Sequence, residues 1–204
     1  MNTSNSKVIN SKIKLLVVFL VIMLISVIGI FYVKNYMSYS TFKKSDAYTE
    51  KIITHKMFFD YASQLKLYNY QGEELSQSQH ANQITKINQA NAVIVHLWAS
   101  WCDPCINELP ELIDYLKLNE KQIKSGELAI VLVSLDYESP DITKFLKSFN
   151  ELNNPDYFQI WDKNTELQKY LNIDRLPSTV VFYNNDQTER FLTVVNWKKF
   201  KLKF

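Results

Sequence analysis

Cysteine, glycine and histidine are all scarce in this chain, which holds two, three and three of them among 204 residues. Two cysteines are too few for the common four-ligand structural zinc site, and His55, His80 and His96 show no ligand spacing. Basic runs are also missing. Beyond residue 33 the chain has 20 basic and 21 acidic side chains, so it lacks the charge that nucleic acids attract. We therefore predict no metal site and no nucleic-acid partner.

One long apolar run lies near the N-terminus. Leu15–Val33 carries no charge, and a helix of this length, at about 1.5 Å per residue, matches a bilayer core. Lysines precede the run, and bulky residues follow it in place of a small-residue cleavage site. We predict a short cytoplasmic tail (1–14), a transmembrane signal anchor in the lipid bilayer (15–33), a tether (34–62) and a domain (63–204). A cleaved signal peptide is the alternative, because signal cores and anchors overlap in length.

The predicted domain alternates between strand and helix patterns. Ala92–Trp98 and Leu128–Leu135 are apolar runs typical of strands that are covered on both faces. Late in the chain, Thr179–Tyr183 and Arg190–Val195 predict a hairpin around an Asn-Asn-Asp turn. The fold class is therefore α/β, with a mixed central sheet flanked by helices.

Both cysteines stand in one Cys-x-x-Cys pair, Cys102 and Cys105, where a strand pattern changes to a helix pattern. Unpaired N–H groups and the helix dipole favour a thiolate at the first cysteine, and the thiolate is the nucleophile. We expect Cys102 to attack a substrate disulfide and Cys105 to resolve the mixed disulfide. No bound cofactor is needed, because the cysteines carry the electrons. The alternative is a permanent structural disulfide, although so short a loop stabilises little.

The two residues between the cysteines indicate whether the pair reduces or oxidises its clients. Pro104 suits a first helical turn because it has no N–H to lose. The carboxylate of Asp103 disfavours a thiolate at Cys102, and a less stabilised reduced form gives a lower potential. We therefore expect a reductant, with a potential below about −200 mV.

The pair and its surroundings resemble the thioredoxin superfamily, and most closely the TlpA/ResA/CcmG branch of membrane-tethered thiol–disulfide proteins. The matching residues are Trp98–Cys105, Glu108, Pro110, Val133–Asp136 and Leu176–Thr179, and the likeness runs from about Leu65 to Trp197. It implies a thioredoxin-like fold on a single-pass anchor. It also implies that Pro177 is a cis-proline facing the disulfide, with an ordinary trans turn as the alternative.

The resemblance also assigns roles to individual residues. The catalytic set is Cys102, Cys105, Glu108 and Pro177. Glu108 corresponds to an acidic residue thought to help proton transfer in that branch; the alternative is a solvated glutamate that interacts with the helix dipole. The expected substrate surface consists of Trp101, Asp103, Pro104 and Leu176.

The chain departs from the family pattern at three places. The fold of the family normally ends in a helix that covers the sheet, whereas the lysine-rich end, 198–204, alternates as a strand would, so we expect the final helix to be short or absent and part of one sheet face to be exposed. The other two departures affect the site. His96 occupies the strand position where thioredoxins carry a buried aspartate, so it is a possible proton relay to Cys105. A buried core histidine is the alternative. Asp174-Arg175-Leu176 stands where a glycine usually precedes the cis-proline, so the shape of the substrate side differs.

These features predict an extracytoplasmic thiol–disulfide oxidoreductase that reduces protein clients and is itself reduced by a membrane electron-donor protein. The expected place is the bacterial inner membrane, with the domain facing the periplasm or the cell exterior. By resemblance, clients include cysteines involved in cytochrome c or copper-site assembly. Three alternatives stay open: a disulfide oxidase or isomerase, a copper-binding assembly factor that uses soft ligands, and an interaction module without redox activity.

Overall fold

The computed structural model describes residues 23, 26 and 53–203. The predicted tail and anchor lie outside this range except for Met23 and Ser26, and so does most of the predicted tether. Among the described residues, no helix has both the length and the apolar character needed to cross a membrane. The anchor therefore stays a prediction.

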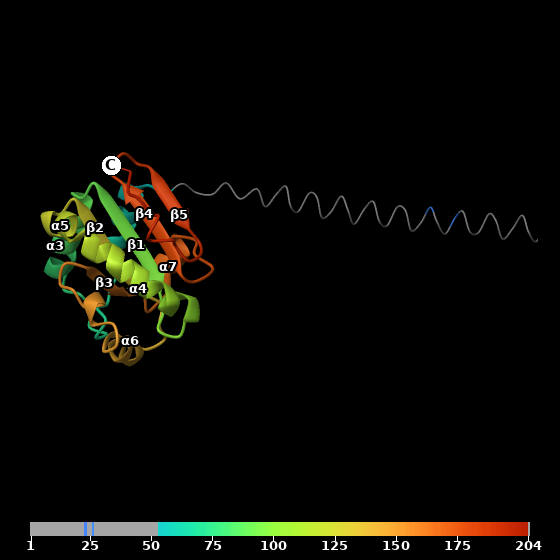
Figure 1. The fold of residues 1–204 in the computed structure, drawn as a ribbon, viewed down its shortest axis with the longest axis horizontal. Helices are drawn as coiled ribbons and strands as arrows, with labels where there is room; N and C mark the ends of the chain where they lie inside the picture. The colour runs from blue at the N-terminus through green and yellow to red at the C-terminus, as the bar shows by residue number, and fades with distance from the viewer. Residues whose placement is uncertain (1–22, 24–25, 27–52, 204) are drawn as a thin grey trace, which may run out of the picture. The chain divides into compact units, whose positions relative to one another are not determined.

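The centre of the domain is a five-stranded sheet in the order β3-β2-β1-β4-β5 (Figure 1). Strand β1 pairs in parallel with β2, and β2 with β3, whereas β4 is antiparallel to both β1 and β5. The predicted mixed sheet is thereby confirmed. The strands are β1 (Ala92–Trp98), β2 (Leu128–Ser134), β3 (Phe158–Trp161), β4 (Ser178–Tyr183) and β5 (Thr188–Phe191).

Alternation along β1 gives the sheet two buried faces. Ile94 and Trp98 lie in one core cluster with helix α4, which crosses the front of the sheet in Figure 1. Val93, Val95 and Leu97 lie in a second cluster, with α2, α3 and α7. The helices are α2 (His55–Ala62), α3 (Gln77–Asn88), α4 (Asp103–Leu118), α5 (Glu120–Ser125), α6 (Ser139–Leu146) and α7 (Glu166–Tyr170), with a 3-10 turn η1 (Asn150–Leu152).

Helix α2 shows that the domain begins before residue 63. The described residues from Ile53 onward belong to the compact unit that holds the sheet, so the end of the predicted tether, 34–62, is part of the domain. Phe58 and Phe59 are buried and pack against Phe182 of β4, with ring centroids 5.1 and 6.4 Å apart. Their burial explains why this helix is part of the folded unit.

The end of the chain covers the sheet without a helix. Residues 192–203, here called the C-terminal segment, form neither helix nor strand. Trp197 of this segment is buried and packs against Tyr115 of α4, with centroids 5.1 Å apart. Val181 and Tyr183 of β4 are buried as well, so the expectation of an exposed sheet face is wrong. The aromatic side chains of the segment supply the cover that a helix was expected to give.

One edge of the sheet gathers the residues singled out in the sequence. Trp98 pairs with Ser134 across β1 and β2, and Leu97 pairs with Ser178 across β1 and β4. The carboxyl ends of β1 and β2 therefore meet the amino end of β4. The Cys-x-x-Cys turn, the end of the Val133–Asp136 segment and Pro177 follow or precede these strands at this edge.

Candidate active site

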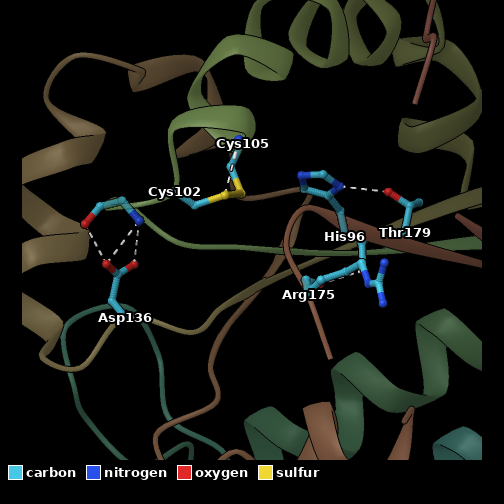
Figure 2. Close-up of a disulfide and its surroundings, with 8 residues drawn as sticks. His96, Cys102, Cys105, Asp136, Arg175 and Thr179 are labelled. Atoms are coloured by element: carbon cyan, nitrogen blue, oxygen red, sulfur yellow. Dashed lines mark hydrogen bonds between the residues drawn. A yellow bond between two sulfur atoms is a disulfide. The ribbon is translucent and has the colours of Figure 1, made fainter. Parts of the chain in front are cut away.

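The two cysteines form a disulfide at the N-terminus of α4, with an S–S distance of 2.14 Å (Figure 2). Cys102 is the N-cap residue of the helix, and its sulfur accepts the Cys105 N–H at 3.3 Å. Cys102 is 6% exposed and Cys105 is fully buried. Since a nucleophile must meet its substrate, this difference favours Cys102 as the attacking cysteine and Cys105 as the resolving one.

An open groove of about 570 Å³ runs beside Cys102. The four residues of the predicted substrate surface, Trp101, Asp103, Pro104 and Leu176, all line it. The structure thus brings this set together, while the binding of clients there stays a prediction.

Tyr137 also lines the groove and was not identified from the sequence. It is 82% exposed and stacks on Trp101, which is 53% exposed, with ring centroids 5.8 Å apart. Large exposed aromatic side chains beside a reactive centre are typical of a protein-binding surface. The sequence indicates a role for Tyr137 only by its position directly after Asp136, at the end of an expected strand.

Pro177 lies directly before β4, and the Leu176–Pro177 peptide bond is cis, as the resemblance implies. The Ser178 hydroxyl donates to the Arg175 carbonyl at 2.8 Å and closes the turn around the proline. Leu176 lines the groove that Cys102 also lines, which places the proline turn at the reactive edge. A catalytic role for Pro177 stays a prediction.

Glu108 lies one helical turn after Cys105 and is only 3% exposed. A solvated glutamate, the alternative considered from the sequence, is therefore wrong. Its Oε1 accepts the Val195 N–H at 2.9 Å and the Trp197 indole N–H at 2.6 Å. Burial raises the pKa of Glu108, and these two bonds partly offset that rise. A carboxyl group with a raised pKa is suited to proton transfer near neutral pH, although that role stays a prediction.

His96 lies inside the sheet and is fully buried. Its Nδ1 is 2.9 Å from the Thr179 hydroxyl on the paired strand β4, as Figure 2 shows, and its Nε2 has no hydrogen-bond partner among the described residues. Burial lowers the pKa of His96 to about 4, so the ring is neutral at pH 7. Holding a proton there is costly at that pH. The position suits a buried core histidine, and the relay to Cys105 stays a prediction.

A buried carboxylate to which the sequence assigned no role holds the turn before the cysteines. Asp136 accepts the Ser100 N–H at 3.0 Å and the hydroxyls of Ser100 and Ser134 at 2.5 and 2.7 Å. Ser100 stands two residues before Cys102, so these bonds fix the path of the chain into α4. Local sequence patterns do not reveal this contact, because Asp136 and Ser100 are 36 positions apart in the sequence.

The side chain of Asp103 is exposed. Solvent and salt screen an exposed charge, so its effect on Cys102 is weaker than the sequence argument assumed. Among residues 23, 26 and 53–203, no group of three or more His, Cys, Asp and Glu side chains is placed to hold a metal ion. The predicted absence of a metal site and of a bound cofactor stays a prediction.

Part of the chain around this site is similar to known proteins. Residues 90–188 match the family model described as thioredoxin-like. The chain is 31% identical over 105 residues to the thiol-disulfide oxidoreductase ResA of Oceanobacillus iheyensis, covering 51% of this chain and 50% of that protein. It is 25% identical over 103 residues to the sporulation thiol-disulfide oxidoreductase A of Bacillus subtilis, covering 50% of this chain and 59% of that protein. The chain thus spans about half the length of the curated relatives it matches.

A solved structure shows the same fold. A secreted disulfide oxidoreductase of Mycobacterium tuberculosis, described as homologous to E. coli DsbE, superposes with a TM-score of 0.52. The identity is 14%, and the match covers 69% of this chain and 93% of the other. The thioredoxin-like fold is confirmed, and the resemblance to the TlpA/ResA/CcmG branch agrees with the curated relatives.

Proposed function

We propose that this chain, a member of the thioredoxin-like family whose relatives are named thiol-disulfide oxidoreductases, exchanges disulfides with protein clients through Cys102 and Cys105. The observation that carries the proposal is the disulfide at the start of α4, in which Cys102 is 6% exposed and lines an open groove while Cys105 is fully buried. A purely structural disulfide would need neither the groove nor the exposed aromatic pair beside it.

In the reducing direction, the Cys102 thiolate attacks a client disulfide, and a client thiolate leaves and takes a proton from solvent. Cys105 then loses its proton and attacks the Cys102 sulfur. This forms the intramolecular disulfide and releases the second client thiolate, which is also protonated. Two electrons and two protons pass to the client, and a dithiol donor must return the protein to its reduced state.

The finer parts of the proposal rest on the sequence and the resemblance. We propose that the domain works outside the cytoplasm, held by the anchor at 15–33, and that a membrane electron-donor protein reduces it. Client cysteines of cytochrome c or of copper sites fit the resemblance to the branch. The Asp103 charge supports a reductant, although its exposure makes that support modest.

Trapping of the mixed disulfide tests the assignment of the two cysteines. The full-length Cys105→Ser variant is expected to accumulate a covalent complex with a disulfide-bearing client, because nothing resolves the Cys102 adduct. The matched Cys102→Ser variant keeps a single buried thiol and is expected to form little complex. Equal trapping by both variants, measured on non-reducing gels and by peptide mass, would show that the roles are assigned wrongly.

A further inference from the structure

The C-terminal segment reaches Glu108, a carboxyl group that follows the resolving cysteine by three residues on α4. The Val195 N–H and the Trp197 indole N–H both donate to Oε1 of Glu108, at 2.9 and 2.6 Å, across 87 and 89 residues of sequence. All three residues are buried. Packing of Trp197 against Tyr115 and Phe200, with centroids 5.1 and 5.4 Å away, holds the indole in place.

These contacts make the two oxygens of Glu108 unequal. Oε1 has two donors and uses both of its in-plane acceptor positions. Oε2 is buried and has no hydrogen-bond partner among the described residues. A proton on this carboxyl group therefore belongs on Oε2, because a proton on Oε1 would displace one of the two donors.

We propose that Trp197 and Val195 are positioning residues for Glu108, which occupy Oε1 and leave Oε2 as the atom that takes up and returns the Cys105 proton. The use of that proton rests on the proposed function. In the resolving step, the Cys105 S–H bond breaks and its proton moves to Oε2. The Cys105 thiolate then forms the bond to the Cys102 sulfur, and the client thiolate leaves. When the disulfide is reduced again, the Oε2 proton returns to Cys105.

The two N–H bonds also set when Glu108 is ionised. Both stabilise the carboxylate, so they hold the pKa of Glu108 below the level that burial alone would give. Glu111 on the same helix acts in the opposite direction and raises this pKa, and Lys198 pairs with Glu111 at 3.0 Å. The His96 ring, on β1, packs edge-on against the Trp197 ring with centroids 6.2 Å apart, but His96 is neutral at pH 7. Cys105 stands three residues before Glu108 on the same helix and is fully buried.

Removal of the indole N–H tests the proposal. Trp197→Phe keeps an aromatic ring and deletes one donor to Oε1. The Glu108 carboxyl, followed by ¹³C NMR in the oxidised full-length protein, is expected to titrate at higher pH than in the parent. Trp161→Phe is the matched control, because it also deletes one buried indole N–H bond, the one to the Asp136 carbonyl at 2.8 Å. It is expected to leave the Glu108 titration unchanged.

An unchanged Glu108 titration in Trp197→Phe, or an equal change in both variants, would overturn the proposal. The pH profile of the resolving step is expected to move to higher pH together with the carboxyl. A profile that stays in place while the carboxyl moves would overturn the role in proton transfer. Trapping of a mixed disulfide by Cys105→Ser does not depend on Glu108. That experiment therefore tests the proposed function independently of the role of Glu108.

A second measurement needs no tryptophan variant and covers the case in which Trp197→Phe fails to fold. In the parent protein, the indole N–H signal of Trp197 is expected to shift with pH at the midpoint of the Glu108 titration. This shift should vanish in Glu108→Gln, and the Trp161 signal should show none at that midpoint. A Trp197 indole N–H signal that does not shift with pH at the midpoint of the Glu108 titration would overturn the proposal.

Discussion

His96 makes the stability of the domain depend on pH in a way that a single substitution isolates. The ring is fully buried, and burial lowers its pKa from 6.5 to about 4. Between these two values the unfolded chain binds a proton at this residue and the folded chain does not. The stability it contributes is therefore fully present above about pH 6.5, is lost as the pH falls through this window, and is gone below about pH 4.

The size of the effect follows from the shift. A lowering from 6.5 to about 4, at about 1.36 kcal/mol per pH unit, corresponds to roughly 3 kcal/mol. In His96→Asn the side chain at this position does not titrate. Between pH 7 and pH 4, the free energy of unfolding of this variant should therefore fall by roughly 3 kcal/mol less than that of the parent protein. The comparison uses the change with pH in each variant, because the substitution also alters packing.

Urea unfolding of the parent and of His96→Asn at several pH values measures this difference. Burial also lowers the pKa of His55 and His80, but both are present in each variant and cancel. Thr179→Val is the matched control: it removes the hydroxyl next to Nδ1 and keeps the buried ring, so it should retain the pH dependence of the parent. Identical pH profiles for the parent and His96→Asn would refute the assignment of a buried neutral imidazole.

Two further predictions concern residues to which the sequence assigned no role. Asp136→Ala leaves the donors of half-buried Ser100 and buried Ser134 without their acceptor, so thermal or urea unfolding should show a loss of about 3 kcal/mol. A loss below about 1 kcal/mol would contradict the positioning role. Tyr137→Ala should lower kcat/KM for a protein client roughly tenfold and leave the rate of exchange with a small disulfide unchanged. Stopped-flow assays with each substrate measure both rates, and equal effects on the two substrates would exclude a contact between Tyr137 and the client.

Local patterns were sufficient for the central sheet and the reactive pair. The apolar run at Ala92–Trp98 became β1 with the predicted bounds, and the change of pattern at the cysteines became the start of α4. The cis bond before Pro177 was implied by resemblance only, because an X-Pro dipeptide alone does not distinguish cis from trans.

Contacts between distant parts of the chain explain what the sequence did not reveal. The tether prediction allowed for some helix but did not assign α2 to the domain. The buried residues His55, Phe58, Phe59 and Ala62 recur at helical spacing, but a polar histidine and the short length weaken the pattern. The lysine-rich end gave no sign that Trp197 would bind Glu108, a residue 89 positions earlier. Likewise, Asp136 became part of the site only through the pairing of β1 with β2.

The central claim is that Cys102 and Cys105 form a reducing, exchangeable couple. Equilibration of the full-length protein with dithiothreitol or glutathione buffers, followed by trapping of free thiols, measures its reduction potential. The account predicts a couple that equilibrates readily, with a potential below about −200 mV. A potential near about −120 mV would mean that the protein oxidises its clients, and a disulfide that does not exchange at all would contradict the claim.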